Sequence, residues 1–536
     1  MDAEKKQTAV TVMEDGKKIL YKLRQGESLF EILKKEELSF SSHCGGKGIC
    51  KRCRVRFLSG AVLPSAGDRA AFTPEELRQG FRLACLSKPM RDCEIELYVQ
   101  KEKQINVLTD VKDVKDVTDV SVASVVSEVY GIQESQNQAG NGHGNGNGNE
   151  EDTLIAIDLG TTTIAMELRG LMTKRVYGTF CEINPQRAYG ADVISRIQAA
   201  MEQEGRKKLQ QLIRDSLEKG IQKLLTVAEE KGLRKPKEAY LSGNTPMRQL
   251  FMGHSVENLG IYPFLPENIN RQETSLQGIK TILIPGISAF VGGDIAAGLY
   301  YVKKQGGFCK KAPELFIDLG TNGEMAIGND SRILVTATAA GPAFEGGSGE
   351  TIMGADLIAC LDELKKQGIL DETGLLQEPW FEEGIHIGKA VLKGKDVRGL
   401  QMAKAAVFAG ICLLIDRYGI GIEELERVYL AGGFGYYLNV ESAVSMGLIP
   451  IELGEKITAV GNTSLAGAFL YGKDCMESAK GEGKERDELE KLIEKCGKLN
   501  LAEEEQFQKL YIRSMSLKPL SYEELKKELE QEREAE

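Results

Sequence analysis

LIAIDLGTTT at residues 154–163 and LFIDLGTNGE at residues 315–324 are two versions of one pattern. Each begins as an apolar run that predicts a buried strand, and each then turns through Asp, Gly and Thr. An Asp at a strand end can hold Mg²⁺ through water or orient an attacking water, and the N–H and hydroxyl groups of the turn can cradle phosphate oxygens. A single turn of this kind is common in hairpins. Two copies 160 residues apart, each followed by an alternating apolar strand, predict a duplicated phosphate-binding unit.

A third glycine-rich element, VYLAGGFG at residues 428–435, follows another predicted strand. Adjacent glycines there would leave room for the sugar and base of a nucleotide, although close packing of a helix on the sheet is the alternative explanation. The sequence contains no GxxxxGK[ST] motif, which excludes a P-loop ATPase.

Other segments of the same region are candidates for the site. Asp294, after Gly292-Gly293 and the strand at 281–285, could add a metal-facing carboxylate or could be a helix N-cap. SGNT at 242–245 and GNT at 461–463 predict tight turns near a cleft. AGPAFEGG at 340–347 is too rich in glycine for a regular element and could be a loop that contacts nucleotide or partner. Its Glu345 is either a base or an ordinary surface carboxylate.

A cysteine-rich loop near the N-terminus indicates a metal centre. Cys44, Cys50 and Cys53 are spaced x5 and x2, and Cys85 follows 32 residues later. A [2Fe-2S] cluster needs four thiolates, which a tight loop and one distant residue can supply, and the glycines at 45, 46 and 48 let backbone N–H groups point at the sulfurs. A structural zinc site would favour two CxxC pairs, and only one is present. Cys93, on an alternating strand, is interpreted as a packed thiol.

The patterns around these motifs divide the chain into several parts. Residues 1–100 predict a small α+β unit with strands at 8–13, 19–23 and 55–58, a helix at 28–35 and a capping box at Thr73–Glu76. Residues 101–151 predict a flexible linker, which includes GNGHGNGNGN with His143. As a flexible chain, the whole linker would span a root-mean-square distance of about 35–45 Å. An α/β body of two halves, 152–310 and 311–475, follows, and residues 476–536 predict packed helices with Leu489, Leu492, Phe507, Leu510 and Tyr511 inside.

Composition excludes several classes of function. The chain has 536 residues, a net charge of −11 and no run of eighteen apolar residues, so neither general nucleic-acid binding nor a membrane span is expected. Eleven cysteines in so long a chain do not indicate a disulfide scaffold, and the N-terminus lacks an apolar signal region. We therefore expect a cytoplasmic protein.

CGGKGICKRC followed by LACLSKP resembles the plant- and vertebrate-type [2Fe-2S] ferredoxins over about the first hundred residues. The two DLGT loops and AGGFG resemble the superfamily of acetate kinase, sugar kinases, Hsp70 and actin (ASKHA), in which two similar halves clamp ATP. Together with GPAFEGG and VGNTSLAGA, and in this order, the motifs resemble the reductive activators of corrinoid-dependent enzymes over essentially the whole chain.

That resemblance implies a multidomain fold, with a β-grasp ferredoxin-like domain followed by a two-lobed α/β ASKHA ATPase. It implies one-electron reduction of Co(II) to Co(I) in the corrinoid protein of a methyltransferase system, with ATP and Mg²⁺. The chain lacks the Asp-x-His-x-x-Gly motif, so the corrinoid should belong to the partner. The electron donor is unidentified, and a homodimer stays open. The residues carried over are Cys44, Cys50, Cys53 and Cys85 for the cluster, Asp158, Gly160, Thr161, Thr162, Thr163, Asp318, Gly320, Thr321 and Asn322 for phosphates and Mg²⁺, and Gly432, Gly433, Phe434 and Gly435 for adenosine, with Asp294 as a further catalytic candidate.

Three other functions are compatible with parts of the sequence. An activator of a 2-hydroxyacyl-CoA dehydratase would also couple ATP to electron transfer, but relatives of that kind hold a [4Fe-4S] cluster between two subunits. A small-molecule kinase with an appended redox sensor would consume ATP only with its sugar or acid. A purely ATP-dependent binding module would use the cysteine loop as structure and would be colourless.

Overall fold

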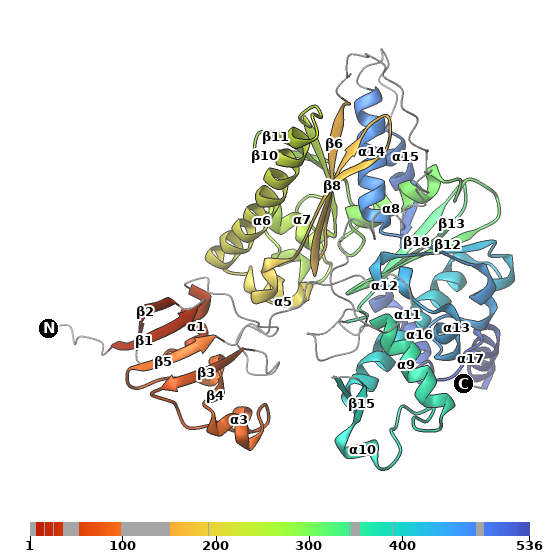
Figure 1. The fold of residues 1–536 in the computed structure, drawn as a ribbon. Coiled ribbons are helices and arrows are strands. Elements are labelled where there is room, and N and C mark those ends of the chain that lie inside the picture. Colours follow the sequence, from red (N-terminus) through yellow and green to blue (C-terminus); the bar gives the residue numbers. More distant parts are fainter. Residues whose placement is uncertain are drawn as a thin grey trace, which may run out of the picture.

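The computed structural model describes residues 7–14, 17–24, 26–35, 53–97, 151–190, 192–341, 344, 354–387, 390–478 and 487–535 (Figure 1). The predictions for residues 101–150 of the linker lie outside the described residues. The described parts form one sheet of five strands near the N-terminus, and two sheets of six strands and a small sheet of two strands in the body. This arrangement confirms the predicted fold class.

The N-terminal unit is a mixed sheet with the order β2-β1-β5-β3-β4, in which β1 and β5 run parallel. The predicted strands and helix are confirmed, and Val10 and Ile95 of the sheet are buried with Phe30 of the first helix. Thr73 and Glu76 form the predicted capping box, with Pro74 at the first helical position. The elements are β1 (Gln7–Glu14), β2 (Lys17–Arg24), α1 (Leu29–Lys35), β3 (Arg54–Ser59), α2 (Ala66–Arg69), α3 (Pro74–Arg78), β4 (Phe81–Leu83) and β5 (Cys93–Leu97).

The first lobe of the body is a six-stranded sheet with the order β10-β11-β9-β6-β7-β8. Its most apolar strand, β6, is buried on both sides, because α6 covers one face and α8 and α14 cover the other. The elements are β6 (Thr153–Leu159), β7 (Thr163–Gly170), β8 (Val176–Ile183), α5 (Val193–Ala199), α6 (Gln203–Glu230), β9 (Glu238–Gly243), α7 (Thr245–Met252), β10 (Gln272–Leu276), β11 (Ile279–Leu283) and α8 (Gly293–Lys304).

The second lobe has the order β18-β17-β12-β13-β14-β19. The long helix α11 lies at the centre of its core together with residues of α9 and α16. The elements are β12 (Glu314–Leu319), β13 (Gly323–Gly328), β14 (Ile333–Thr338), α9 (Gly354–Lys366), α10 (Trp380–Glu383), β15 (Ile385–Ile387), β16 (Ala390–Leu392), α11 (Gly394–Tyr418), β17 (Arg427–Ala431), α12 (Gly432–Tyr437), α13 (Val440–Ser445), β18 (Ile457–Gly461), α14 (Thr463–Ser478), α15 (Glu488–Glu494), β19 (Cys496–Lys498), α16 (Glu505–Arg513) and α17 (Tyr522–Ala535).

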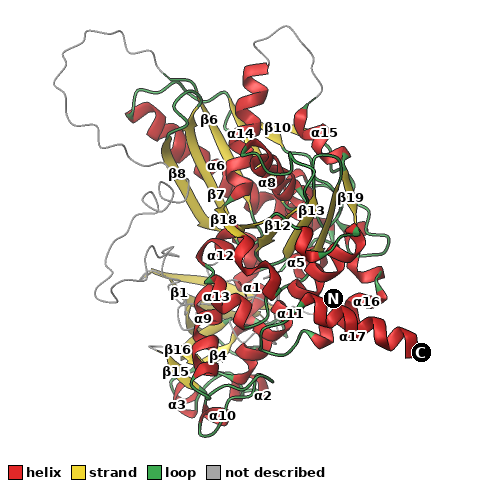
Figure 2. Ribbon diagram, turned by 90° about the vertical axis from the view of Figure 1, so that its right-hand side faces the viewer, coloured by secondary structure: helices red, strands yellow, loops and turns green. Residues whose placement is uncertain are grey.

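The two lobes repeat one topology. In each, the strand that carries the DLGT turn (β6 or β12) pairs antiparallel with the next strand and parallel with a later one (β9 or β17). Helices α8 and α14 pack between the two sheets in a shared core (Figure 1, Figure 2). A Cβ on Gly467 would lie 2.0 Å from the carbonyl oxygen of Ala297, so the two helices meet backbone to backbone.

The C-terminal region combines the predicted helices with an unpredicted strand. Leu489, Leu492 and Leu510 are buried as expected, but β19 pairs parallel with β14 and extends the second sheet. Helix α14 also continues past residue 475, where the sequence suggested a boundary. Helix α17 lies at the outside of the second lobe (Figure 2).

Among the residues that the structure describes, one helix, α11, is long and apolar enough to cross a membrane by length and composition. Of its most apolar stretch, 83% is buried inside the protein, as expected for a core helix.

Candidate functional site

The two DLGT turns face each other across the lobes. The hydroxyl oxygens of Thr162 and Thr321 lie 3.4 Å apart, although the residues are 159 positions apart in the chain. Each turn is closed by a short backbone hydrogen bond, from Gly160 N–H to the Thr163 carbonyl (3.0 Å) and from Gly320 N–H to the Asn322 carbonyl (2.9 Å). The duplicated motif therefore produces two tight loops that meet where the two lobes face each other.

Asp158, at the end of β6, is held by the first residues of α14. Its Oδ2 accepts a hydrogen bond from Asn462 Nδ2 (2.9 Å) and its Oδ1 accepts one from the Ser464 hydroxyl (2.8 Å). Burial raises the pKa of this carboxyl, and the two hydrogen bonds act in the opposite direction. The predicted turn at 461–463 thus lies beside Asp158, and that at 242–245 lies beside the first DLGT turn, where Asn244 Nδ2 donates to the Thr161 hydroxyl (2.7 Å).

Asp318, at the end of β12, has no hydrogen-bond or ion-pair partner within the described residues. Burial, together with the charges of Asp294 and Asp158, raises its pKa to about 8. Asp294 lies in the first turn of α8, where its Oδ1 accepts the N–H of Ile295 (2.9 Å). The N-cap of this helix is Gly292, so the capping alternative for Asp294 is wrong. Burial and the Asp158 charge raise the pKa of Asp294 to about 7.

Glu324 is a fourth carboxylate that sequence reasoning did not single out. It pairs directly opposite Asp318 across β12 and β13, is 7% exposed, and accepts a hydrogen bond from Asn322 Nδ2 (3.1 Å). Burial raises its pKa well above the ordinary value, and the nearby Asp294 and Asp318 add to this shift. The sequence did contain a signal for Glu324, because it is an acidic residue at the end of the second repeat, where the first repeat continues with apolar residues.

The chemical capacity of this site follows from its charge. The charges of Asp158 and Asp294 raise the pKa of Asp318, and those of Asp294 and Asp318 raise the pKa of Glu324, an arrangement that a bound cation would stabilise. Within the described residues, no three His, Cys, Asp or Glu side chains lie close enough to form a protein-only metal cage. Mg²⁺ is usually bound by one or two carboxylates, waters and substrate phosphates, which fits this donor set.

Some positions of the AGGFG segment are explained by packing and another by room for a ligand. Gly432 has φ +87°, and a Cβ there would lie 2.6 Å from Asp318 Oδ1. A Cβ on Gly435 would touch the Leu430 side chain at 2.9 Å, and Phe434 is buried with its ring 4.6 Å from that of Phe344. These three positions have a packing explanation. Gly433 has open space around its Cβ position, so it alone leaves room for a ligand.

The thiol site is only partly within the described residues. Cys53 and Cys85 are buried, and their sulfurs lie 3.2 Å apart. Two thiols brought together from positions 32 apart fit the donor chemistry of an iron centre. Cys44 and Cys50 lie outside the described residues, as do Pro342, Ala343 and 345–347 of the glycine-rich loop. Cys93 is buried on β5, and burial raises its pKa to about 11, so its environment is that of a packed thiol.

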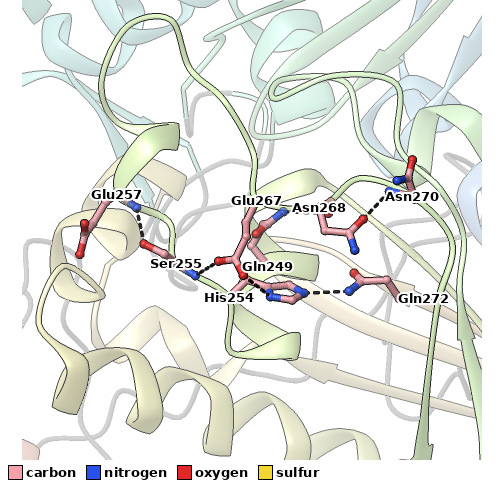
Figure 3. Close-up of polar contacts among 8 residues, drawn as sticks. All are labelled: Gln249, His254, Ser255, Glu257, Glu267, Asn268, Asn270 and Gln272. Atoms are coloured by element: carbon pink, nitrogen blue, oxygen red, sulfur yellow. Dashed lines mark hydrogen bonds and ion pairs between the residues drawn. The ribbon is translucent and has the colours of Figure 1, made fainter.

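A second polar cluster, after α7, has a structural explanation (Figure 3). His254 Nδ1 lies 3.0 Å from Glu267 Oε1, and its Nε2 lies 2.8 Å from Gln272 Nε2. Glu267 Oε2 also accepts the N–H of Ser255 (2.7 Å), and Gln249 Nε2 donates to the Asn268 carbonyl (2.8 Å). These contacts fasten the irregular segment between α7 and β10 to the lobe.

Comparison with protein families divides the chain in the same order as its sheets. Residues 12–90 match the 2Fe-2S iron-sulfur cluster binding domain, residues 154–305 match the RACo middle region, and residues 312–359 and 347–527 match the C-terminal domain of RACo, the ASKHA domain. These matches agree with the sheets of the N-terminal unit and the two lobes.

Individual relatives agree with these families. The chain is 29% identical over 387 residues to a corrinoid activation enzyme, RamQ, of Eubacterium limosum, which covers 59% of this chain and 63% of that protein. It is 26% identical over 378 residues to a [Co(II) methylated amine-specific corrinoid protein] reductase of Methanosarcina barkeri, a match that covers 58% of this chain and 68% of that protein. A solved structure of a reductive activator for a corrinoid, iron-sulfur protein shares the fold, with a TM-score of 0.60 and 24% identity. The match covers 95% of this chain and 98% of that chain.

Proposed function

We propose, from the premise that the chain belongs to the RACo family of reductive activators of corrinoid-dependent enzymes, that it couples ATP hydrolysis to one-electron reduction of a partner's corrinoid. The acceptor is the Co(II) corrinoid of a separate methyltransferase-system protein, which returns to Co(I). The observation that carries the proposal is the order of three matches in one chain, a [2Fe-2S] domain followed by both halves of the RACo body.

The need for ATP follows from the energetics of an uphill electron. Moving one electron against 100 mV costs about 2.3 kcal/mol. Nucleotide binding and hydrolysis can provide this free energy by favouring one arrangement of two lobes over another. The facing loops, whose Thr162 and Thr321 hydroxyl oxygens lie 3.4 Å apart, would be the point at which a bound nucleotide drives such a change.

In the N-terminal domain, Cys44, Cys50, Cys53 and Cys85 would hold the cluster. The cluster, when bound, accepts and releases a single electron. The burial of Cys53 and Cys85 keeps water from their sulfurs. Such thiolates persist in a reducing compartment, and a cytoplasmic location is therefore part of the proposal. The linker at 101–151 would let this domain reach either the body or the partner.

In the body, Asp158 to Thr163 and Asp318 to Asn322 would bind the phosphates and Mg²⁺ of ATP. Gly433 would border the nucleoside, while Gly432, Phe434 and Gly435 would shape that border from behind. Asp294 and Glu324, whose charges interact with that of Asp318, would be the candidates to orient the attacking water.

The test uses anaerobically purified full-length protein with a chemical reductant and candidate corrinoid proteins. We expect iron and sulfide, a rhombic electron-paramagnetic signal on reduction, and ATP-dependent growth of the Co(I) absorbance. Cys85→Ser should remove the signal, whereas Cys93→Ala, a buried thiol of the same domain, should keep it. Asp318→Asn should keep the signal and lose the ATP-dependent reduction.

Three results would contradict the proposal. Protein that contains no iron or sulfide would remove the electron carrier. Equal reduction of the corrinoid with and without ATP would remove the coupling. ATP consumption that depends on an added sugar or acid, and not on a corrinoid protein, would favour the kinase alternative.

A further inference from the structure

The geometry points to Asn462 and Ser464 as positioning residues that orient Asp158 and connect a nucleotide bound there to the helix between the lobes. This inference rests on the proposed ATPase function of the cleft. It concerns residues at the start of α14, about 300 positions along the chain from the loop that they hold.

The first step is the fixed orientation of the carboxylate. Asn462 Nδ2 reaches Asp158 Oδ2 at 2.9 Å, and the Ser464 hydroxyl reaches Oδ1 at 2.8 Å. Rotation of the carboxylate would break both bonds. A carboxylate has about four acceptor positions, so two stay available for a cation, a water or a phosphate-bound proton donor.

The second step is that the donors are themselves fixed. Asn462 Oδ1 accepts the N–H of Leu465 (2.9 Å), as an N-cap does. The Ser464 hydroxyl also lies 2.7 Å from the Ser242 hydroxyl, and Ser242 Oγ in turn donates to the Ile157 carbonyl (3.0 Å). The ends of β9 and β6 and the start of α14 therefore share one network of hydrogen bonds.

The third step is the connection to the second lobe. Helix α14 directly follows β18 of the second sheet, yet it packs between the sheets against α8. Gly467 of α14 packs directly against the backbone of Ala297 in α8, so a shift of one helix at this point presses on the other. The first turn of α8 carries Asp294. A ligand that draws on Asp158 thus acts on both helices and, through them, on both lobes.

Two substitutions separate positioning from structure. Asn462→Asp keeps an oxygen that can cap α14, because Asp and Asn cap about equally well, but it replaces the amide donor to Asp158 with a second carboxyl that repels the Asp158 charge. Ser464→Ala removes the other donor. Thr463→Val is the matched control, since the Thr463 hydroxyl is buried next to these residues and has no hydrogen-bond partner within the described residues.

Steady-state ATP hydrolysis and binding of MgADP by calorimetry are measured for each protein. A hydrogen bond to a charged group is strong enough to predict roughly a tenfold or greater fall in kcat for Asn462→Asp and Ser464→Ala. The Kd for MgADP should change less than about threefold, and Thr463→Val should match the wild type. A positioning role predicts this separation of kcat from binding, whereas simple misfolding would reduce both together.

Hydrogen exchange of α14 gives a readout independent of turnover. Saturating MgADP should slow exchange at 463–478 in the wild type and in Thr463→Val, but not in Asn462→Asp or Ser464→Ala. Variants with wild-type kcat, or with the same MgADP-dependent protection of α14, would overturn the inference. A wild-type protein that does not hydrolyse ATP would instead refute the proposed function.

Discussion

Replacing Glu167 with Gln should raise the stability of the first lobe at neutral pH and reduce its dependence on pH. Glu167 lies on β7, is 1% exposed, and neither of its carboxylate oxygens has a hydrogen-bond partner within the described residues. Its ion-pair contact is Arg169, whose Nη1 lies 3.5 Å from Oε2. That guanidinium also donates to the Lys174 carbonyl and lies 4.3 Å from the ring centre of Phe469, so it compensates the carboxylate only in part.

The magnitude follows from the shift in pKa. Burial raises the pKa of Glu167 from 4.5 to about 7, against the opposing effect of Arg169. Because the folded protein then binds the proton more tightly than the unfolded chain, stability is lost as pH rises from about 4.5 to about 7. At about 1.36 kcal/mol per pKa unit, the loss at neutral pH and above is about 3 kcal/mol. Gln has the same shape and cannot ionise, so it should avoid this loss.

Urea denaturation monitored by circular dichroism, at values between about pH 5 and pH 8, measures the difference in stability between Glu167→Gln and the wild type. The advantage of Glu167→Gln should be small at the acid end and grow toward neutral pH. Glu229→Gln, at an exposed position on α6, should leave the profile unchanged. A Glu167→Gln protein that is less stable at neutral pH, or whose profile runs parallel to that of the wild type, would refute the reasoning.

Three further perturbations test other parts of the structure. Gly432→Ala should lower the free energy of unfolding by about 1–3 kcal/mol, because φ is +87° and the new Cβ would lie 2.6 Å from Asp318 Oδ1. Gly433→Ala, whose Cβ would meet open space, should keep the stability of the wild type but weaken MgADP binding in calorimetry. Glu324→Gln should lower ATP turnover about tenfold or more in steady-state assays with unchanged circular dichroism, and full activity would remove Glu324 from the mechanism. Burial lowers the pKa of Lys404 to about 7, so the unfolded chain binds the proton more tightly and the wild type should gain stability between about pH 7 and pH 10.5. Lys404→Met should abolish this gain, and an unchanged denaturation profile would contradict the prediction.

Local patterns were sufficient for the fold because each one reflects a nearby physical requirement. The apolar runs at 154–159 and 315–319 became central strands because both of their faces are buried. The capping box at Thr73 was predictable because all of its partners lie within three residues. The β19 strand was not, since three residues ending in Gly and Lys carry no strand pattern and depend on pairing with β14.

The sequence by itself determined the four-cysteine loop, the two DLGT turns and the order of the parts, since spacing and composition specify these without knowledge of distant contacts. Only the tertiary structure decided that Asn462 and Ser464 hold Asp158, that Glu324 lies beside Asp318, and that Gly432 and Gly435 serve packing. The reason is that each of these contacts depends on how the sheets and helices are placed against one another, and no local period in a chain encodes that placement.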